Sequence, residues 1–320
     1  MADLRNGSRK KIVVIGGGTG NFGVLSGLKQ YPVDLSAVVS MSDSGGHSGK
    51  LRDELGVLPP GDVRACLVAL ADDDKVGILR DLFSYRFEEG SQRGASVGNL
   101  LLTALSDLLG GFDKGVAAAH QLLGIKGRVI PVALHKADLL AELEDGTILF
   151  GEMAIDLPRE NGHLRIKRVW LQPKVKTNPE ALRALRDADV IVFGPGDLYT
   201  SIMPNLCTVG MHEAIRASKA RLVCNVNIMT KHGETDGFGV DEFVHVLESA
   251  LPRPFDFVIY NNKKIPASLI TKYRSQHAQP FAVKQPKANW IGRDLLSTKG
   301  NFARHDPKKI AEAVMSVVVA

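Results

Sequence analysis

A glycine-rich segment near the start of the chain could bind an anion through its backbone. The segment GGGTG, residues 16–20, comes directly after the apolar run KIVVI and before apolar residues at helical spacing, Phe22, Leu25 and Leu28. This order predicts a strand, a tight turn and a helix. Amides at the start of a helix point outward and the helix dipole favours negative charge there, so phosphate is the group that these residues suit.

A second glycine-rich segment, SDSGGHSG at residues 42–49, follows the apolar run at 35–39. Neighbouring parallel strands end at one edge of a sheet, so we expect both glycine loops to face one crevice and to hold one elongated phosphorylated ligand. Asp43 could coordinate Mg²⁺ or accept a hydrogen bond from a hydroxyl group. Because Gly49-Lys50 is followed by Leu51 and not by Ser or Thr, the segment is not a P-loop, and an ordinary nucleoside triphosphatase is disfavoured.

The first glycine cluster also leaves two alternatives open. Gly18, Gly20 and Gly23 meet the pattern G-x-G-x-x-G, and Asp43 lies at about the right distance beyond them for an NAD(P)-dependent oxidoreductase. Against this, the glycines are shifted relative to the strand, and no residue is identifiable as a partner for hydride transfer. The other alternative is a tight strand-to-helix turn that binds nothing.

The segment LPPGDVR, residues 58–64, predicts the start of another helix. Its prolines fix the backbone, so Asp62 is expected to act as the N-cap and Arg64 to project from the first turn. An arginine near the positive end of a helix dipole is unfavourable unless it meets an anion. Arg64 is therefore a candidate anion ligand, with a solvated helix face as the alternative.

Two later segments place polar residues after apolar runs. GPGDLYTS, residues 194–201, again combines glycines with an acid and hydroxyl groups, and CNVNIMT, residues 224–230, supplies amides and a hydroxyl group. If the sheet is parallel, both lie at the same carboxyl edge as the glycine loops. Their side chains can form hydrogen bonds to a base or a sugar. A loop whose polar residues only stabilise the loop itself contains the same residue types.

The pattern of elements predicts an α/β fold with a Rossmann-like, mostly parallel sheet flanked by helices. Strands are expected at 11–15, 35–39, 129–132, 190–193, 222–226 and 255–260, with a long helical excursion at 61–124 and a final helix from about Asp306. Asp145-Gly146 between extended segments indicates a hairpin, so an antiparallel subdomain is expected at 133–172. We expect a single domain over residues 1–320, with residues 1–10 flexible.

Composition excludes several classes of protein. The net charge is +5 from 40 basic and 35 acidic residues, without basic runs interleaved with aromatic residues, so a nucleic-acid partner is not expected. The three cysteines form no C-x-x-C element and do not indicate a disulfide framework. No run of about eighteen apolar residues and no apolar leader occur, which excludes a membrane span and predicts a cytoplasmic protein.

Seven motifs in order, GGGTG, SDSGGHSG, LPPGDVR, SVGNLLL, GPGDLYTS, MTKHGETDGF and ARHDP, closely resemble the YvcK family of gluconeogenesis factors within the CofD-like superfamily. The resemblance implies cytoplasmic proteins that bind UDP-sugars and support cell-wall precursor supply and cell shape. It also implies a second branch, the CofD transferases, which move a phospholactyl group from a guanosine diphosphate-linked donor to a deazaflavin alcohol and use Mg²⁺.

The resemblance assigns individual residues as well. It makes residues 17–20 the phosphate cradle, places Asn99 of SVGNLLL at the mouth of the crevice, and matches Arg304 to a basic position used for the nucleotide sugar. The chain departs from the family where Ser42 and Ser44 flank Asp43 without a second acid, where His47 replaces a serine, and at Asp197, where serine is commoner. Asp197 adds negative charge beside the expected diphosphate.

The leading hypothesis is therefore a cytoplasmic protein that binds a UDP-sugar and acts through regulatory partners, with a homo-oligomer left open. A Mg²⁺-dependent transferase similar to CofD is the alternative, with Asp43, Asp62 and Arg64 as catalytic candidates and Asp43 as the candidate metal ligand. The expected ligand-binding residues are Gly17, Gly18, Thr19, Gly20, Asp43, Ser44, Gly45, Gly46, Ser48, Asn99, Gly194, Gly196, Asp197, Tyr199, Thr200, Asn225, Thr230 and Arg304.

Overall fold

The centre of the molecule is a seven-stranded sheet. The computed structural model describes residues 9–72, 77–158, 162–297 and 302–318, so most of the segment expected to be flexible lies outside the described residues. The strands of this sheet are β1 (Lys11–Gly16), β2 (Asp34–Val39), β3 (Arg128–Pro131), β7 (Val190–Phe193), β8 (Arg221–Asn225), β9 (Phe257–Asn261) and β10 (Trp290–Arg293). All neighbouring strands run parallel, in the order β10-β9-β8-β7-β1-β2-β3.

The strand order reverses direction at β1. From β1 the chain moves outward to β2 and β3, and it then returns to β7 on the other side of β1 before it continues to β8, β9 and β10. In an open parallel sheet the loops that follow the two strands at such a point diverge and leave a crevice at the carboxyl edge. The loops after β1 and β7 are therefore the ones that flank this crevice.

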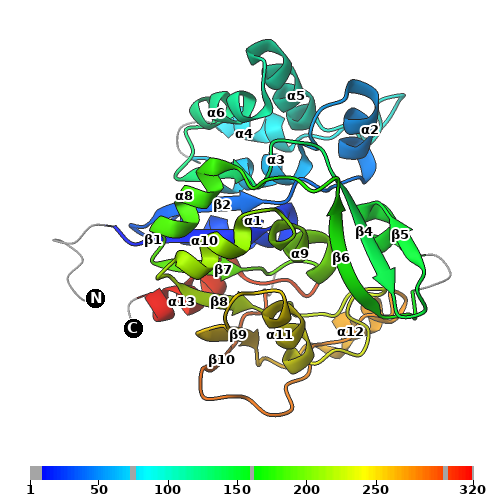
Figure 1. Ribbon diagram of the computed structural model, residues 1–320, viewed down its shortest axis with the longest axis vertical. Coiled ribbons are helices and arrows are strands. Elements are labelled where there is room, and N and C mark those ends of the chain that lie inside the picture. The colour runs from blue at the N-terminus through cyan, green and yellow to red at the C-terminus, as the bar shows by residue number, and fades with distance from the viewer. Residues whose placement is uncertain (1–8, 73–76, 159–161, 298–301, 319–320) are drawn as a thin grey trace.

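Helices cover both faces of the larger sheet, which explains why β1 is apolar between its ends. Four consecutive residues of β1, Ile12 to Ile15, are at most 2% exposed, as expected for a strand buried on both sides. The helix α1 (Gly18–Leu28) packs against α3 (Gly61–Leu70) and α13 (Pro307–Val318), whereas α8 (Pro179–Asp187) packs against α10 (Met211–Ala217). Figure 1 shows α8 and α10 in front of the sheet and α1 behind it.

A helical excursion separates β2 from β3, as the sequence predicts. In addition to α3, the excursion contains the helices α2 (Gly46–Leu55), α4 (Gly77–Ser84), α5 (Val97–Leu109) and α6 (Phe112–Leu122). Figure 1 shows this group stacked above the edge of the sheet that carries β2. The excursion brings the first turn of α3 next to the glycine loop after β1, because α1 and α3 pack together.

The second sheet is antiparallel and consists of β4 (Asp138–Leu143), β5 (Ile148–Phe150) and β6 (Ile166–Gln172) in the order β5-β4-β6. The expected hairpin turn lies between β4 and β5, where Gly146 has φ 88° and the Thr147 amide donates to Asp145 Oδ1 at 2.9 Å. A short helix, α7 (Glu152–Asp156), follows β5. The predicted α/β class, with its parallel sheet, helical excursion and antiparallel element, is thus confirmed.

Other elements differ from the expected pattern. The segment GPGDLYTS runs into a π-helical turn, η1 (Leu198–Ile202), which continues as α9 (Met203–Leu206). The sequence patterns did not predict α11 (Val240–Ser249), α12 (Ala267–Arg274) or β10. The apolar residues of α12 are Leu269, Ile270 and Tyr273, which are only partly buried against a small second cluster, and β10 is a four-residue edge strand. None of the helices within the described ranges is long and apolar enough to cross a membrane.

Candidate functional site

Three glycine-containing loops meet at the carboxyl edge of the sheet. The loops after β1 and β2 are adjacent because Gly16 pairs with Val39 and the Ser40 amide donates to Gly16 O at 3.1 Å. On the other side, a Cβ atom on Gly20 would overlap the carbonyl oxygen of Pro195 in the loop after β7. Only glycine permits this approach of the two backbones. Segments 16–20, 43–49 and 194–197 thus meet at this edge, at the place where the strand order predicts a crevice.

Asp62 reaches across this crevice to the start of α1. Its helix, α3, begins at Gly61 after Pro60, and no side chain caps it, so the expectation that Asp62 is the N-cap is wrong. The Asp62 carboxylate instead accepts a hydrogen bond from the Gly18 amide. Because α1 has no cap of its own at Gly17, its free amides attract the nearest carboxylate. Burial, together with the nearby charge of Asp43, raises the pKa of Asp62 to about 7.

Asp43 lies beside Asp62 at the floor of the crevice. It accepts hydrogen bonds from the Gly45 amide at 2.9 Å and from the Ser48 hydroxyl group, but burial raises its pKa above the usual value. Asn99 lies behind this loop and not at the mouth of the crevice: it is fully buried, and its Nδ2 donates to Ser48 Oγ at 3.3 Å. Asn99 therefore supports the loop that presents Asp43.

Arg64 points away from the crevice into the helical excursion. Its Nη1 donates to the carbonyl of Phe83 at 3.0 Å, and burial together with the nearby Arg86 lowers its pKa. Arg52, in α2, is engaged in an ion pair with Asp138 at the start of β4. Arg64 is thus directed toward α4, and Arg52 is directed toward the second sheet.

The loop after β7 is held by side chains from the loop after β8. Glu234 accepts hydrogen bonds from the Tyr199 amide at 2.6 Å and from Thr200 Oγ1 at 2.8 Å. Asn227 exchanges two hydrogen bonds with the backbone of Gly196, at 2.8 and 2.9 Å. Burial and the charge of Asp197 raise the pKa of Glu234 to about 8. The amides at the start of η1 therefore already bind a carboxylate of the protein itself.

Three expected ligand-binding residues have other partners. Asn225 donates through Nδ2 to Gly194 O at 3.3 Å, and Thr230 Oγ1 accepts from the Gln279 amide at 2.9 Å. Arg304 lies in the segment before α13 with its guanidinium 5.6 Å from the ring centroid of Phe302. Thr19, by contrast, is exposed at the start of α1 beside the crevice.

The α7 strap, residues 151–156, lies across the crevice and carries two further acids. Glu152 Oε2 accepts from the Ser44 amide at 3.3 Å, and the Met153 amide donates to Ser44 Oγ at 3.0 Å. Asp156 Oδ1 lies 2.9 Å from Lys231 Nζ. Burial and the charge of Asp43 raise the pKa of Glu152 to about 7. The strap is thus tied to the loops after both β2 and β8.

The crevice is rich in carboxylates. Asp156, Asp197 and Glu234 bring one oxygen each within 4.8 Å of one another, and Asp43 and Asp62 form a second group. Carboxylate oxygens are the ligands that Mg²⁺ prefers, so either group could hold such an ion. A diphosphate in this crevice would need a neutralising cation, because like charges repel strongly where water is scarce.

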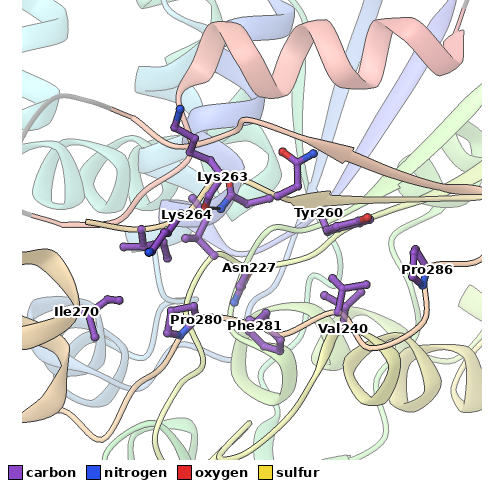
Figure 2. A pocket seen from close by; sticks show the side chains of 14 residues that line it. Asn227, Val240, Tyr260, Lys263, Lys264, Ile270, Pro280, Phe281 and Pro286 are labelled. Atoms are coloured by element: carbon purple, nitrogen blue, oxygen red, sulfur yellow. Dashed lines mark hydrogen bonds between the residues drawn. The ribbon is translucent and has the colours of Figure 1, made fainter. Parts of the chain in front are cut away.

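A cavity of about 500 Å³ opens farther along the same edge, beyond β8 and β9. Figure 2 shows Ile270 and Lys264 at one end and Pro286 at the other, with Asn227 and Phe281 between them. The remaining lining residues are Ile228, Val240, Tyr260, Asn261, Asn262, Lys263, Ile265, Pro280 and Val283. Asn227, in the loop after β8, lines this cavity and bonds to Gly196 of the loop after β7, so the cavity adjoins the crevice.

The charge of the cavity region is opposite to that of the crevice. Residues 257–293, which supply most of the cavity lining, include seven basic and no acidic side chains. The basic residues are Lys263, Lys264, Lys272, Arg274, Lys284, Lys287 and Arg293. All seven are exposed. An anionic molecule is therefore attracted to this end of the carboxyl edge, whereas a cation is attracted to the crevice.

Comparison with known proteins identifies the family. A sequence profile described as 2-phospho-L-lactate transferase CofD matches residues 12–299. The chain belongs to the CofD family. The resemblance predicted from the seven motifs is thereby confirmed.

Within the CofD family, this chain is similar to gluconeogenesis factors. It is 40% identical to the gluconeogenesis factor of Halalkalibacterium halodurans, with 96% of each chain covered. It is 38% identical to that of Bacillus subtilis, over 98% of this chain and 99% of the relative. A crystal structure of a protein from Bacillus halodurans has a TM-score of 0.90 and 39% identity, and covers 96% of this chain and 100% of that one.

Several acids and one base of this CofD-family crevice were not among the expected site residues: Glu152, Asp156, Lys231 and Glu234. Glu234 and Lys231 belong to the segment after β8, and a search of every acid and base in such strand-end loops could have found them. Glu152 and Asp156 carry no local signal. Glu152 is 108 positions from its partner Ser44, and Asp156 is bound to Lys231, so only the packing of the second sheet brings these residues together.

Proposed function

We propose that this CofD-family protein binds a UDP-sugar and acts in the cytoplasm as a gluconeogenesis factor. The names of its relatives in H. halodurans and B. subtilis support the general role. The likeness of its motifs to the YvcK family supports the ligand, with a function in cell-wall precursor supply and cell shape exerted through regulatory partners.

The observation that carries this proposal is the continuity of crevice and cavity at one edge of the sheet. A volume of about 500 Å³ lies within the range of pockets that bind small molecules, and its lining combines apolar side chains with amides and a tyrosine, as a nucleoside requires. The diphosphate would then lie by the glycine loops at 17–20 and 43–49, on the crevice side of Asn227. A divalent cation at the carboxylates would offset their repulsion.

Titration of the purified protein with UDP-N-acetylglucosamine tests this proposal. We expect saturable binding by calorimetry and a rise in melting temperature that grows with ligand concentration. UDP alone should bind more weakly, and GDP and NADH serve as controls for the base and for a dinucleotide. If no stabilisation occurs at millimolar UDP-sugar, with or without Mg²⁺, the proposal is wrong.

A second function, a Mg²⁺-dependent transferase, is favoured by one observation, the adjacent carboxylates of Asp43 and Asp62. These residues fit Mg²⁺ because both are oxygen donors at the floor of the crevice, and the ion would supply positive charge to phosphoryl oxygens. Arg64 points to Phe83 and would have to turn to contribute. Phosphorus NMR of a nucleoside-diphosphate-linked donor mixed with an alcohol acceptor tests this function, and Asp43→Asn should abolish any turnover.

A further inference from the structure

In the part of the chain that the structure describes, Lys231 is a cation that faces the acids Asp156, Asp197 and Glu234. Its Nζ lies 2.9 Å from Asp156 Oδ1, and 31% of its side chain is exposed. Its charge also acts on Asp197 and Glu234. A lysine ammonium group has three donors on a flexible four-carbon stem, so it can change partners without a change in the backbone.

The backbone of Lys231 is fixed independently of this ion pair. Its amide donates to Thr235 Oγ1 at 2.8 Å, and its carbonyl accepts from the Thr235 amide at 2.8 Å. The same turn presents Glu234 to the loop after β7. Loss of the Lys231 side chain should therefore leave this turn in place.

The ion pair joins the α7 strap to the crevice against electrostatic repulsion. Glu152 of the strap lies near the charges of Asp43 and Asp62, and Asp156 lies near that of Asp197. The polar side of the strap is held by two hydrogen bonds to Ser44 and by the ion pair with Lys231. Its other attachments are the Gly151 amide, which donates to Leu139 O at 2.8 Å, and Ile155, which is buried in the core. Without Lys231, the two acids of the strap would face mainly like charges, and its apolar packing would act against that repulsion.

We propose that Lys231 contacts the diphosphate of the bound nucleotide sugar, and that it exchanges Asp156 for phosphate when the ligand enters, which releases the α7 strap. A phosphate group between the glycine loops needs a cation, and Lys231 is partly exposed in the adjoining loop. It cannot neutralise Asp156 and a phosphate fully at the same time, so the two anions compete for it. This inference rests on the proposed function and adds a residue that binds the ligand and a segment that responds to it.

Because Lys231 and Asp156 compete in this way, substitutions at the two partners should have opposite effects on affinity. Lys231→Gln removes the phosphate contact and should weaken UDP-N-acetylglucosamine binding about tenfold, the usual size of a charge-assisted hydrogen bond. Asp156→Asn frees Lys231 and should tighten binding several-fold. If the ion pair served only to hold the strap, both substitutions would break it and shift affinity in the same direction.

Glu152→Gln is the matched control, because it removes a negative charge from the same strap without freeing Lys231. If Glu152→Gln and Asp156→Asn tightened ligand binding equally, the lower negative charge of the strap would explain the effect. That result would overturn the proposed exchange of Asp156 for phosphate at Lys231. Amide hydrogen exchange across residues 152–158 gives an independent readout: it should increase when ligand saturates the wild type. Unchanged exchange would overturn the release of the strap.

Inorganic pyrophosphate, used as a second probe, separates this inference from the proposed function. If the wild type binds pyrophosphate but no UDP-sugar, and the variants show opposite shifts, the exchange at Lys231 is supported while the nucleotide-sugar assignment fails. If the wild type binds UDP-sugar and Lys231→Gln binds it equally well, the exchange fails while the assignment is supported. If neither probe binds the wild type, both are refuted.

Discussion

The raised pKa of Glu152 predicts how the stability of the protein depends on pH. A carboxyl group whose pKa rises from 4.5 in the unfolded chain to about 7 in the folded protein keeps its proton longer when folded. Between these pH values the unfolded chain has already lost the proton, so the free energy of unfolding falls as pH rises, and it is constant with respect to this group above pH 7. At about 1.4 kcal/mol per pKa unit, the cost at pH 8 is up to about 3 kcal/mol.

Glu152→Gln should remove this cost. The glutamine can still accept from the Ser44 amide through its side-chain oxygen, and it adds a donor that can face Asp43. We expect the variant to be as stable as the wild type near pH 4.5 and more stable by up to about 3 kcal/mol at pH 8. Urea denaturation at a series of pH values, in buffer with a chelator to exclude divalent cations, measures the difference.

Glu142→Gln, in β4 of the small sheet that precedes the α7 strap, is the control. Lys167 and Arg168 donate to Glu142 and hold its pKa below the usual range, so this substitution should bring no stabilisation that grows between pH 4.5 and 7. If the effect of Glu152→Gln on stability were the same at pH 5 and pH 8, then the carboxylates of the strap and of the crevice floor would not interact as the structure indicates.

Three further predictions concern the crevice. Gly20→Ala places a Cβ atom against the carbonyl of Pro195, so it should separate the loops after β1 and β7. Calorimetry should then show ligand binding weakened more than about tenfold. Gly23→Ala is the control: its Cβ meets nothing within 4 Å, so this variant should bind ligand normally and be about 0.5–1 kcal/mol more stable. Asn205→Ala removes an amide that donates to three carbonyl groups at the end of β1 and in η1, so urea denaturation should show a loss of about 2 kcal/mol. Mg²⁺ should raise the melting temperature of the wild type in a thermal-shift assay and leave that of Asp43→Asn nearly unchanged; an equal rise in both would place the ion elsewhere.

The local features of the fold could be predicted because each depends on neighbouring residues. The order KIVVI, GGGTG and a helical pattern specifies a strand, a turn and a helix within residues 11–28, where β1 and α1 lie. The pair Asp145-Gly146 specifies a tight turn, since glycine adopts a positive φ readily. The common edge of the glycine loops also follows from sequence, because buried apolar strands joined by helices form a parallel sheet.

The assignment of roles within the site depended on contacts between distant segments. Asp62 looked like a helix cap because it follows Pro-Pro-Gly, but the packing of α3 on α1 gives it the amide of Gly18. Arg64 looked like an anion ligand because it opens a helix, but the neighbouring α4 offers the carbonyl of Phe83.

By itself, the sequence determined the α/β class, the parallel sheet, the glycine loops and the family, because these depend on short-range patterns and on motifs in order. Only the tertiary structure decided that the crevice is acidic, that the α7 strap crosses it, and that Lys231 meets Asp156 there. The contacts of the strap join residues separated by 75 or more positions, as between Asp156 and Lys231, and no local pattern encodes them. The pKa values of the acids are a property of the assembled site, because burial and neighbouring charges set them, and both exist only after the two sheets have packed together.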